Sequence, residues 1–120
     1  MAVTLENNAR NAACDAIAAL HNSGTLEFQT SGNVEVATVT FASTAFGSAV
    51  NGVATANAIG SDNSATGGTT TKFVTKTSGA AAILSGTVGT SGTDVIIDNT
   101  VVGAGVTVAM TSFTITVPAS

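Results

Sequence analysis

The sequence predicts a mainly β protein: a single β-sandwich or jelly-roll-like domain spanning residues 1–120, with one N-terminal α-helix at residues 4–22 and a β-rich part at residues 25–118. Two observations predict this class. After Gly24, short runs of Thr, Val, Ile and Phe alternate with clusters of Gly, Ser, Asn and Asp, which is typical of many short strands joined by turns. The core must also be built from small or β-branched side chains and five Phe, because Trp and Tyr are absent, and such side chains pack well on pleated sheets.

The N-terminal helix is predicted from an apolar stripe between about Leu5 and His21. Its members recur three or four residues apart: Leu5, Ala9, Ala12, Ala13, Ala16, Ile17 and Leu20. Asn7, Asn8, Asn11 and Asp15 are expected on the opposite face. Thr4 is expected to cap the helix, and Asn22-Ser23-Gly24 to end it. Because the stripe is mostly alanine, we expect it to pack closely on a sheet and to take part in assembly as well.

Eight strands are expected in the rest of the chain. They lie near residues 25–30, 34–41, 52–59, 71–77, 81–88, 93–98, 106–110 and 112–117. This density of short strands is typical of a sandwich or jelly roll. The longest predicted loop is 60–70, and Pro118 is expected to stop the last strand because it has no N–H to donate.

The composition and the hydropathy of the chain argue against nucleic-acid binding and against a membrane span. The chain has three basic and seven acidic side chains, 8% in all, against about a quarter in an ordinary soluble protein. With only Arg10, Lys72 and Lys76 as cations, nucleic-acid binding is not expected, because its affinity comes largely from basic contacts to phosphates. No window approaches 18 uninterrupted apolar residues, so no membrane span is expected. The N-terminus shows no secretory signal, which predicts synthesis in the cytoplasm.

Candidate chemical motifs all have simpler interpretations. The glycine-rich stretch 86–92 leads into a predicted strand rather than a helix, so it is interpreted as a turn and not a phosphate loop. Asp94 and Asp98 share one face of a predicted strand, but with no histidine beside them they are interpreted as solvated carboxylates. Asp62 and Asn63 lack the alternating oxygen ligands of a calcium loop, so turn chemistry explains them.

The single cysteine and the single histidine do not form a catalytic pair. Cys14 and His21 are seven residues apart on the predicted helix, about 10 Å at 1.5 Å per residue, which is too far for a base to activate a thiol. His21 is explained as a cation favoured by the helix C-terminus. One cysteine also excludes an intramolecular disulfide and a thiolate metal cluster. We therefore expect no enzyme activity, no cofactor and no metal.

Several stretches of the chain carry a family resemblance that runs from end to end. They are residues 9–17 (ARNAACDAI), 45–49 (AFGSA), 52–59 (GVATANAI), 86–92 (GTVGTSG) and 112–120 (SFTITVPAS). Together they resemble a family of small virion structural proteins of tailed bacteriophages, encoded among the head genes and often thought to be capsid decoration or cement proteins. The resemblance implies a compact β-rich subunit without a cofactor, which binds copies of itself and a shell.

The expected function is therefore that of a capsid decoration or cement protein, which binds the outer surface of the major capsid protein shell and localises to the virion. The expected contact residues are Leu5, Arg10, Cys14, Phe46 and Asp62. The alternatives are a tail, neck or fibre component and a carbohydrate-binding or adhesion module. The lack of Trp and Tyr argues against the last, because these are the side chains that usually stack on sugar rings.

Overall fold

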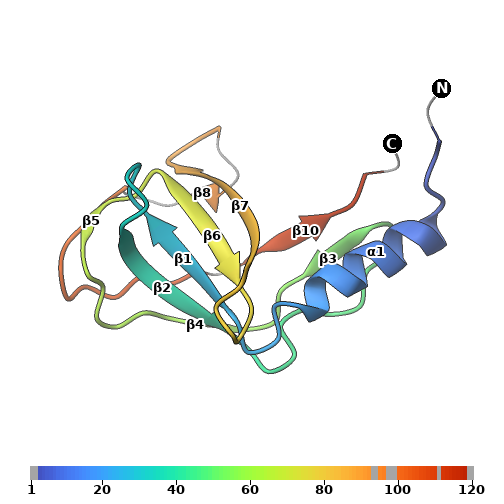
Figure 1. The fold of residues 1–120 in the computed structure, drawn as a ribbon, viewed down its shortest axis with the longest axis horizontal. Helices are drawn as coiled ribbons and strands as arrows, with labels where there is room; N and C mark the ends of the chain where they lie inside the picture. Colours follow the sequence, from blue (N-terminus) through green and yellow to red (C-terminus); the bar gives the residue numbers. More distant parts are fainter. Residues whose placement is uncertain (1–2, 93–94, 97–99, 111, 119–120) are drawn as a thin grey trace.

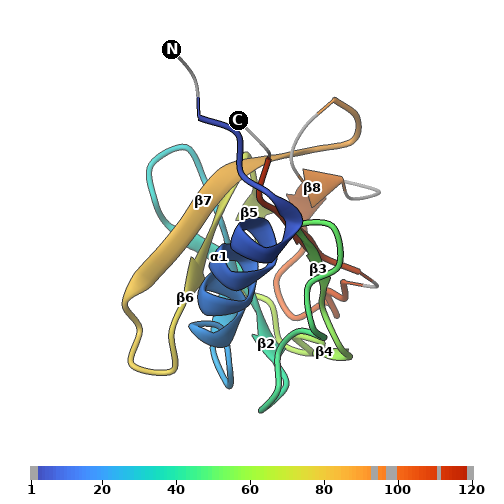
Figure 2. The same cartoon turned by 90° about the vertical axis from the view of Figure 1, so that its right-hand side faces the viewer.

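The structure is a computed structural model that describes residues 3–92, 95–96, 100–110 and 112–118, and it is mainly β with one helix (Figure 1). The elements are α1 (Asn7–Ala19), β1 (Thr25–Gln29), β2 (Glu35–Phe41), β3 (Val53–Thr55), β4 (Ile59–Gly60), β5 (Gly68–Thr69), β6 (Lys72–Lys76), β7 (Ala82–Gly89), β8 (Val95–Ile96), β9 (Val101–Val102) and β10 (Thr114–Thr116). The molecule is elongated, with extents of 46 × 31 × 23 Å. Figures 1 and 2 show α1 alongside β3, at the end of the molecule away from β5.

A six-stranded sheet in the order β4-β2-β1-β6-β7-β8 forms the main body. Its neighbouring strands are antiparallel except for β7 and β8, which run parallel. Two smaller sheets pair β10 with β3 and β5 with β9. The described sheets are not closed, so the structure supports the mainly β class with one helix and does not confirm the predicted sandwich or jelly roll.

Most of the longer predicted strands are present. Residues 25–30, 34–41, 71–77, 81–88 and 112–117 correspond to β1, β2, β6, β7 and β10, and the prediction at 93–98 is described only at β8. The predicted strand 52–59 is divided between β3 and β4, because the Asn57 amide donates to Ala45 O between them, at 2.8 Å. The prediction of a strand at 106–110 is wrong: Val106 N donates a hydrogen bond to Gly103 O within a turn, and only an isolated bridge joins Val108 to Asp62.

Alternation along the strands builds the core. In β1, Leu26 and Phe28 are buried while Thr25, Glu27 and Gln29 face the other way, as the period of two requires. In β6, Phe73 and Thr75 take the buried positions. Toward the helix, four Phe rings and one imidazole pack edge to face or tilted, with centroids 5.3–6.1 Å apart; they belong to Phe41, Phe46, Phe73, Phe113 and His21.

The helix is present but rotated from its predicted orientation. Its buried residues are Cys14 and Ala18, whereas most of the predicted apolar stripe is exposed: Leu5, Ala9, Ala12, Ala16 and Leu20. Ala13 and Ile17 lie half-buried at the boundary. The predicted Thr4 cap is also wrong, because the N-cap is Glu6, which makes no side-chain capping hydrogen bond.

Polar side chains explain the rotation. Asn11 Oδ1 accepts a hydrogen bond from Gly52 N at 2.9 Å, and Asp15 Oδ1 accepts one from Ala49 N at 2.8 Å. These loop amides need partners once they are covered, so the helix turns its short polar side chains toward them. Alanine offers too little apolar area to outweigh those hydrogen bonds. The expectation that Asn11 lies on the face opposite the packed side of the helix is therefore wrong.

Candidate interaction surfaces

The described residues contain no group of three or more His, Cys, Asp or Glu side chains that could hold a metal ion. Residues 4–8, at the helix N-terminus, line an open depression of about 410 Å³ in which Glu6 is the sole ionisable side chain. An isolated carboxylate there has no partner for acid–base work. The absence of enzyme activity, cofactor and metal stays a prediction. The Asp94 and Asp98 pair lies outside the described residues.

Cys14 is in the core rather than at a contact surface. It is fully buried, and its thiol donates to Ile115 O with an Sγ–O distance of 3.4 Å. Burial raises the pKa of the Cys14 thiol, which favours the unreactive protonated form. Its side chain cannot touch a partner in this conformation, so its choice as a contact residue is corrected: Cys14 joins α1 to β10.

Phe46 is also a core residue. Its side chain is 6% exposed, and its ring lies 5.4 Å from His21 and 5.7 Å from Phe41 between centroids. The sequence around it reads as an exposed turn, but a Phe ring gains more by joining the aromatic cluster than by remaining in water. Its choice as a contact residue is therefore also corrected.

Leu5 and Arg10 lie at the end of the molecule that carries α1, and they differ in how far a partner could contact them. Leu5 is 38% exposed and stays available to a partner. Arg10 is half-buried; its Nε donates to Val117 O at 2.9 Å and its Nη1 to Asn7 Oδ1 at 3.3 Å. Gly52, at φ +77°, lets these groups meet, because a Cβ there would lie 2.6 Å from Val117 O. Arg10 therefore ties the C-terminal segment to the helix.

Asp62 holds a loop onto the main sheet. Its Oδ2 accepts from Thr38 N at 2.8 Å and its Oδ1 accepts from Ser64 N at 2.9 Å, while its backbone exchanges two hydrogen bonds with Val108. Both carboxylate oxygens already have N–H partners, which favours the turn interpretation over a cation ligand. The half-buried carboxylate offers little to a docking partner.

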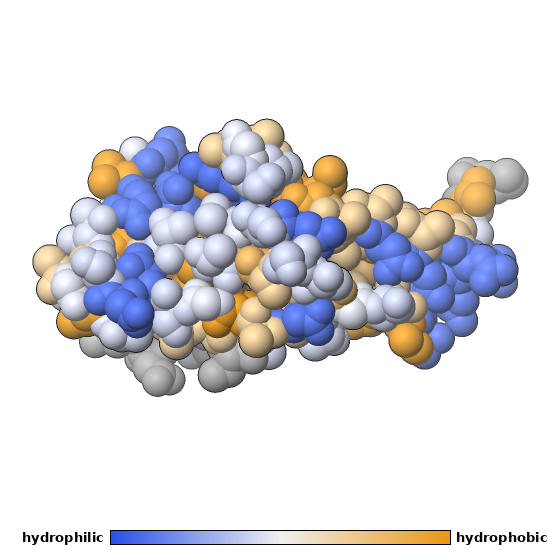
Figure 3. Space-filling model, turned by 90° about the horizontal axis from the view of Figure 1, so that it is seen from below, coloured by the Kyte–Doolittle hydropathy of each residue, from blue (hydrophilic) through white to orange (hydrophobic). Residues whose placement is uncertain are grey.

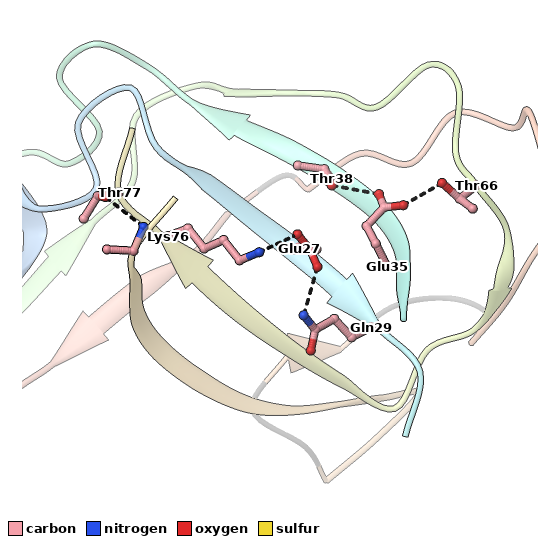
Figure 4. A network of polar contacts seen from close by, with 8 residues as sticks. Glu27, Gln29, Glu35, Thr38, Thr66, Lys76 and Thr77 are labelled. Atoms are coloured by element: carbon pink, nitrogen blue, oxygen red, sulfur yellow. Dashed lines mark hydrogen bonds and ion pairs between the residues drawn. The ribbon is translucent and has the colours of Figure 1, made fainter. Parts of the chain in front are cut away.

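A polar network on the outer face of the main sheet was not predicted (Figure 4). Glu27 accepts from Lys76 Nζ and from Gln29 Nε2, both at 2.9 Å, and Glu35 accepts from the hydroxyls of Thr38 and Thr66. Burial raises the pKa of Glu27, but the hydrogen bonds from Gln29 and Lys76 and the lysine charge outweigh it, so the pKa is lowered overall. The alternation Glu27-Phe28-Gln29 was the sequence signal for this outward face.

The three basic side chains all donate to groups of the chain itself. Arg10 binds Val117 O, Lys72 binds Asn33 Oδ1, and Lys76 binds Glu27. Figure 3 shows one face as a patchwork of hydrophilic, intermediate and hydrophobic residues rather than one continuous hydrophobic area. The basic side chains are therefore engaged within the subunit.

The helix leaves one small apolar surface exposed, which we call the outer helix face. It consists of the exposed residues Ala9, Ala12, Ala16, Ala19 and Leu20, and Leu20 is 52% exposed. Their spacing of three and four places them on one side of α1. At 1.5 Å per residue and a width of about 10 Å, this face measures roughly 170 Å². No charged side chain belongs to it.

In comparisons with known proteins, no family model, curated protein or solved structure matches the chain. Among the residues that the structure describes, no helix is long and apolar enough to cross a membrane.

Proposed function

We propose that the protein is a non-enzymatic structural component of a tailed-phage virion: a capsid decoration or cement protein that binds the outer surface of the major capsid protein shell. The observation that carries the proposal is the outer helix face, an uncharged helical surface that the subunit does not use for its own core. The end-to-end family resemblance and the scarcity of charged side chains support it as well.

In this proposal the subunit stabilises the shell by adding buried area across seams between capsid proteins. The outer helix face gives about 4 kcal/mol at roughly 25 cal/mol per Å², before the cost of association. A stable interface needs about 800 Å² from each partner, so this face acts with neighbouring surfaces such as Leu5, or with copies of the subunit bound together.

The experiment is reconstitution of purified protein onto particles that lack it, measured by sedimentation and quantified per particle. We expect saturable binding that changes little between low and high salt, because the basic side chains are already engaged within the subunit. Ala16→Glu places a charge in the centre of the outer helix face and should abolish most binding. The matched control Ser78→Glu adds the same charge on the exposed β6–β7 turn and should bind normally. Equal binding by both variants would exclude the outer helix face as the contact.

A tail, neck or fibre component would use the same uncharged face, so it remains the second candidate within the structural class. Copy number separates the two roles, because a decoration protein is present in numbers comparable with the capsid protein and a tail component in few copies.

A further inference from the structure

The joint between α1 and the main sheet is built around one buried histidine. His21 follows α1 in the turn that leads to β1, and its side chain is fully buried. It lies 2.9 Å from Ile17 O through Nδ1 and 2.9 Å from Thr75 Oγ1 through Nε2. Ile17 belongs to α1 and Thr75 to β6, so the imidazole connects the helix to the centre of the main sheet.

The hydrogen-bond partners define the protonation state that fits. A carbonyl oxygen can only accept, so Nδ1 carries the hydrogen and donates it to Ile17 O. Nε2 then accepts from the Thr75 hydroxyl, whose oxygen accepts in turn from Leu84 N at 3.0 Å. The neutral imidazole satisfies every atom of this chain, which runs from α1 through β6 to β7. A second hydrogen on Nε2 would force the buried Thr75 hydroxyl to reverse its donor role.

No described charged side chain faces the imidazole to compensate a positive charge. From α1, Asp15 points to Ala49 N and Cys14 to Ile115 O. Lys72 and Lys76 in β6 are on the opposite face of the strand from Thr75, since side chains alternate. The acidic side chains of the neighbouring strands are engaged elsewhere: Glu27 with Lys76, and Glu35 with two threonines. The remaining neighbours, Phe41 and Phe46, carry no charge.

We propose that His21 is a pH-sensitive latch: in its neutral form it holds α1 against the main sheet, and its protonation opens this joint. Opening would let α1, with the outer helix face that it carries and the β3–β10 pair that it packs against, move relative to the main sheet. The latch follows from the buried hydrogen-bond chain and does not depend on the proposed function.

The direction of the pH effect follows from linkage. Burial lowers the pKa of His21 below the ordinary 6.5, and its hydrogen bonds to the backbone of Ile17 and Ala18 only partly oppose this. The folded protein binds a proton at His21 less readily than the opened protein does, because the folded-state pKa is lowered. The stability of the closed joint is therefore complete above pH 6.5 and decreases as the pH falls below 6.5 toward the folded-state pKa. The opening constant should rise by up to tenfold for each pH unit in this window.

The test follows the distance between helix and sheet, and the hydrogen exchange of one amide in the joint, from pH 7.5 to 5.0. Because the chain has a single histidine, no other side chain has an ordinary pKa in that range. Spin labels on Ala12→Cys and Ser85→Cys, one on the exposed side of α1 and one on β7, report the distance between helix and sheet. Hydrogen exchange at Leu84 N reports the bond to Thr75. We expect a broadened distance distribution below pH 6.5. We also expect a lower protection factor at Leu84 N there, that is, faster exchange relative to the intrinsic amide exchange rate at the same pH.

His21→Gln, which cannot titrate, should remove the pH dependence of both readouts. If this variant does not fold, Thr75→Val serves instead: it removes the hydroxyl that accepts from Leu84, and it should show fast exchange already at pH 7.5. A wild-type protein whose distances and whose protection factor at Leu84 N stay constant from pH 7.5 to 5.0 would overturn the latch. So would an identical pH dependence in His21→Gln.

Discussion

The rotation of α1 predicts that the same substitution is strongly destabilising at one helix position and nearly neutral at another. Ala18 is 5% exposed and packs on the core side, whereas Ala16 is exposed on the outer helix face. Glu at position 18 would place a carboxylate without a partner in a packed site, which costs about 3–5 kcal/mol. Glu at position 16 should change the free energy of unfolding by less than about 0.5 kcal/mol, since both residues favour helices.

Scanning calorimetry at pH 7 measures both variants. At roughly 4 °C per kcal/mol for a domain of this size, Ala18→Glu should lower the Tm by about 12–20 °C or prevent folding, and Ala16→Glu should stay within about 2 °C of the wild type. The two variants share charge, helix and chain length, so each controls the other. A large loss in Ala16→Glu with none in Ala18→Glu would refute the helix rotation and restore the alanine stripe as the buried face.

Three further outcomes follow from single contacts. Cys14 should resist thiol reagents in the native protein and react once denaturant unfolds it, because it is buried with a raised pKa; ready labelling of the folded protein would contradict this. Arg10→Ala should cost about 1 kcal/mol and speed hydrogen exchange at Val117 N, whose segment Arg10 secures; unchanged exchange would argue against that role. Lys76→Met should lower the free energy of unfolding by less than about 1 kcal/mol, since the ion pair with Glu27 is partly exposed. In this variant the lowered pKa of Glu27 should return toward its usual value. The stability that the wild type loses as the pH falls below 4.5 should therefore be smaller in the variant, which denaturant unfolding at several pH values would measure.

The strands that the sequence predicts best are those with a clear alternation. In β1 and β6, buried and outward residues alternate without interruption, and a period of two has no other interpretation over five residues. The two-residue strands β5 and β9 carry no such pattern, since Gly68 pairs with Val102 and Thr69 with Val101 over too short a stretch to show alternation. Their pairing depends on tertiary packing and not on local preference.

The helix shows why hydropathy alone can choose the wrong face. Alanines supplied the predicted stripe, yet the burial of Cys14 and Ala18 is accompanied by hydrogen bonds that Asn11 and Asp15 accept from loop amides far along the chain. Those partners are 34 and 41 residues away, so no local pattern could reveal them. His21 was missed for the same reason, because its partner Thr75 is 54 residues away.

The central claim is that the protein is a subunit of the capsid surface, and quantitative mass spectrometry of purified virions tests it most directly. Peptides of this chain, counted against peptides of the major capsid protein, give the number of copies in each particle. The account predicts a copy number comparable with that of the capsid protein, and its loss when the wild-type chain is replaced by Ala16→Glu. A handful of copies per particle, or none, would contradict it.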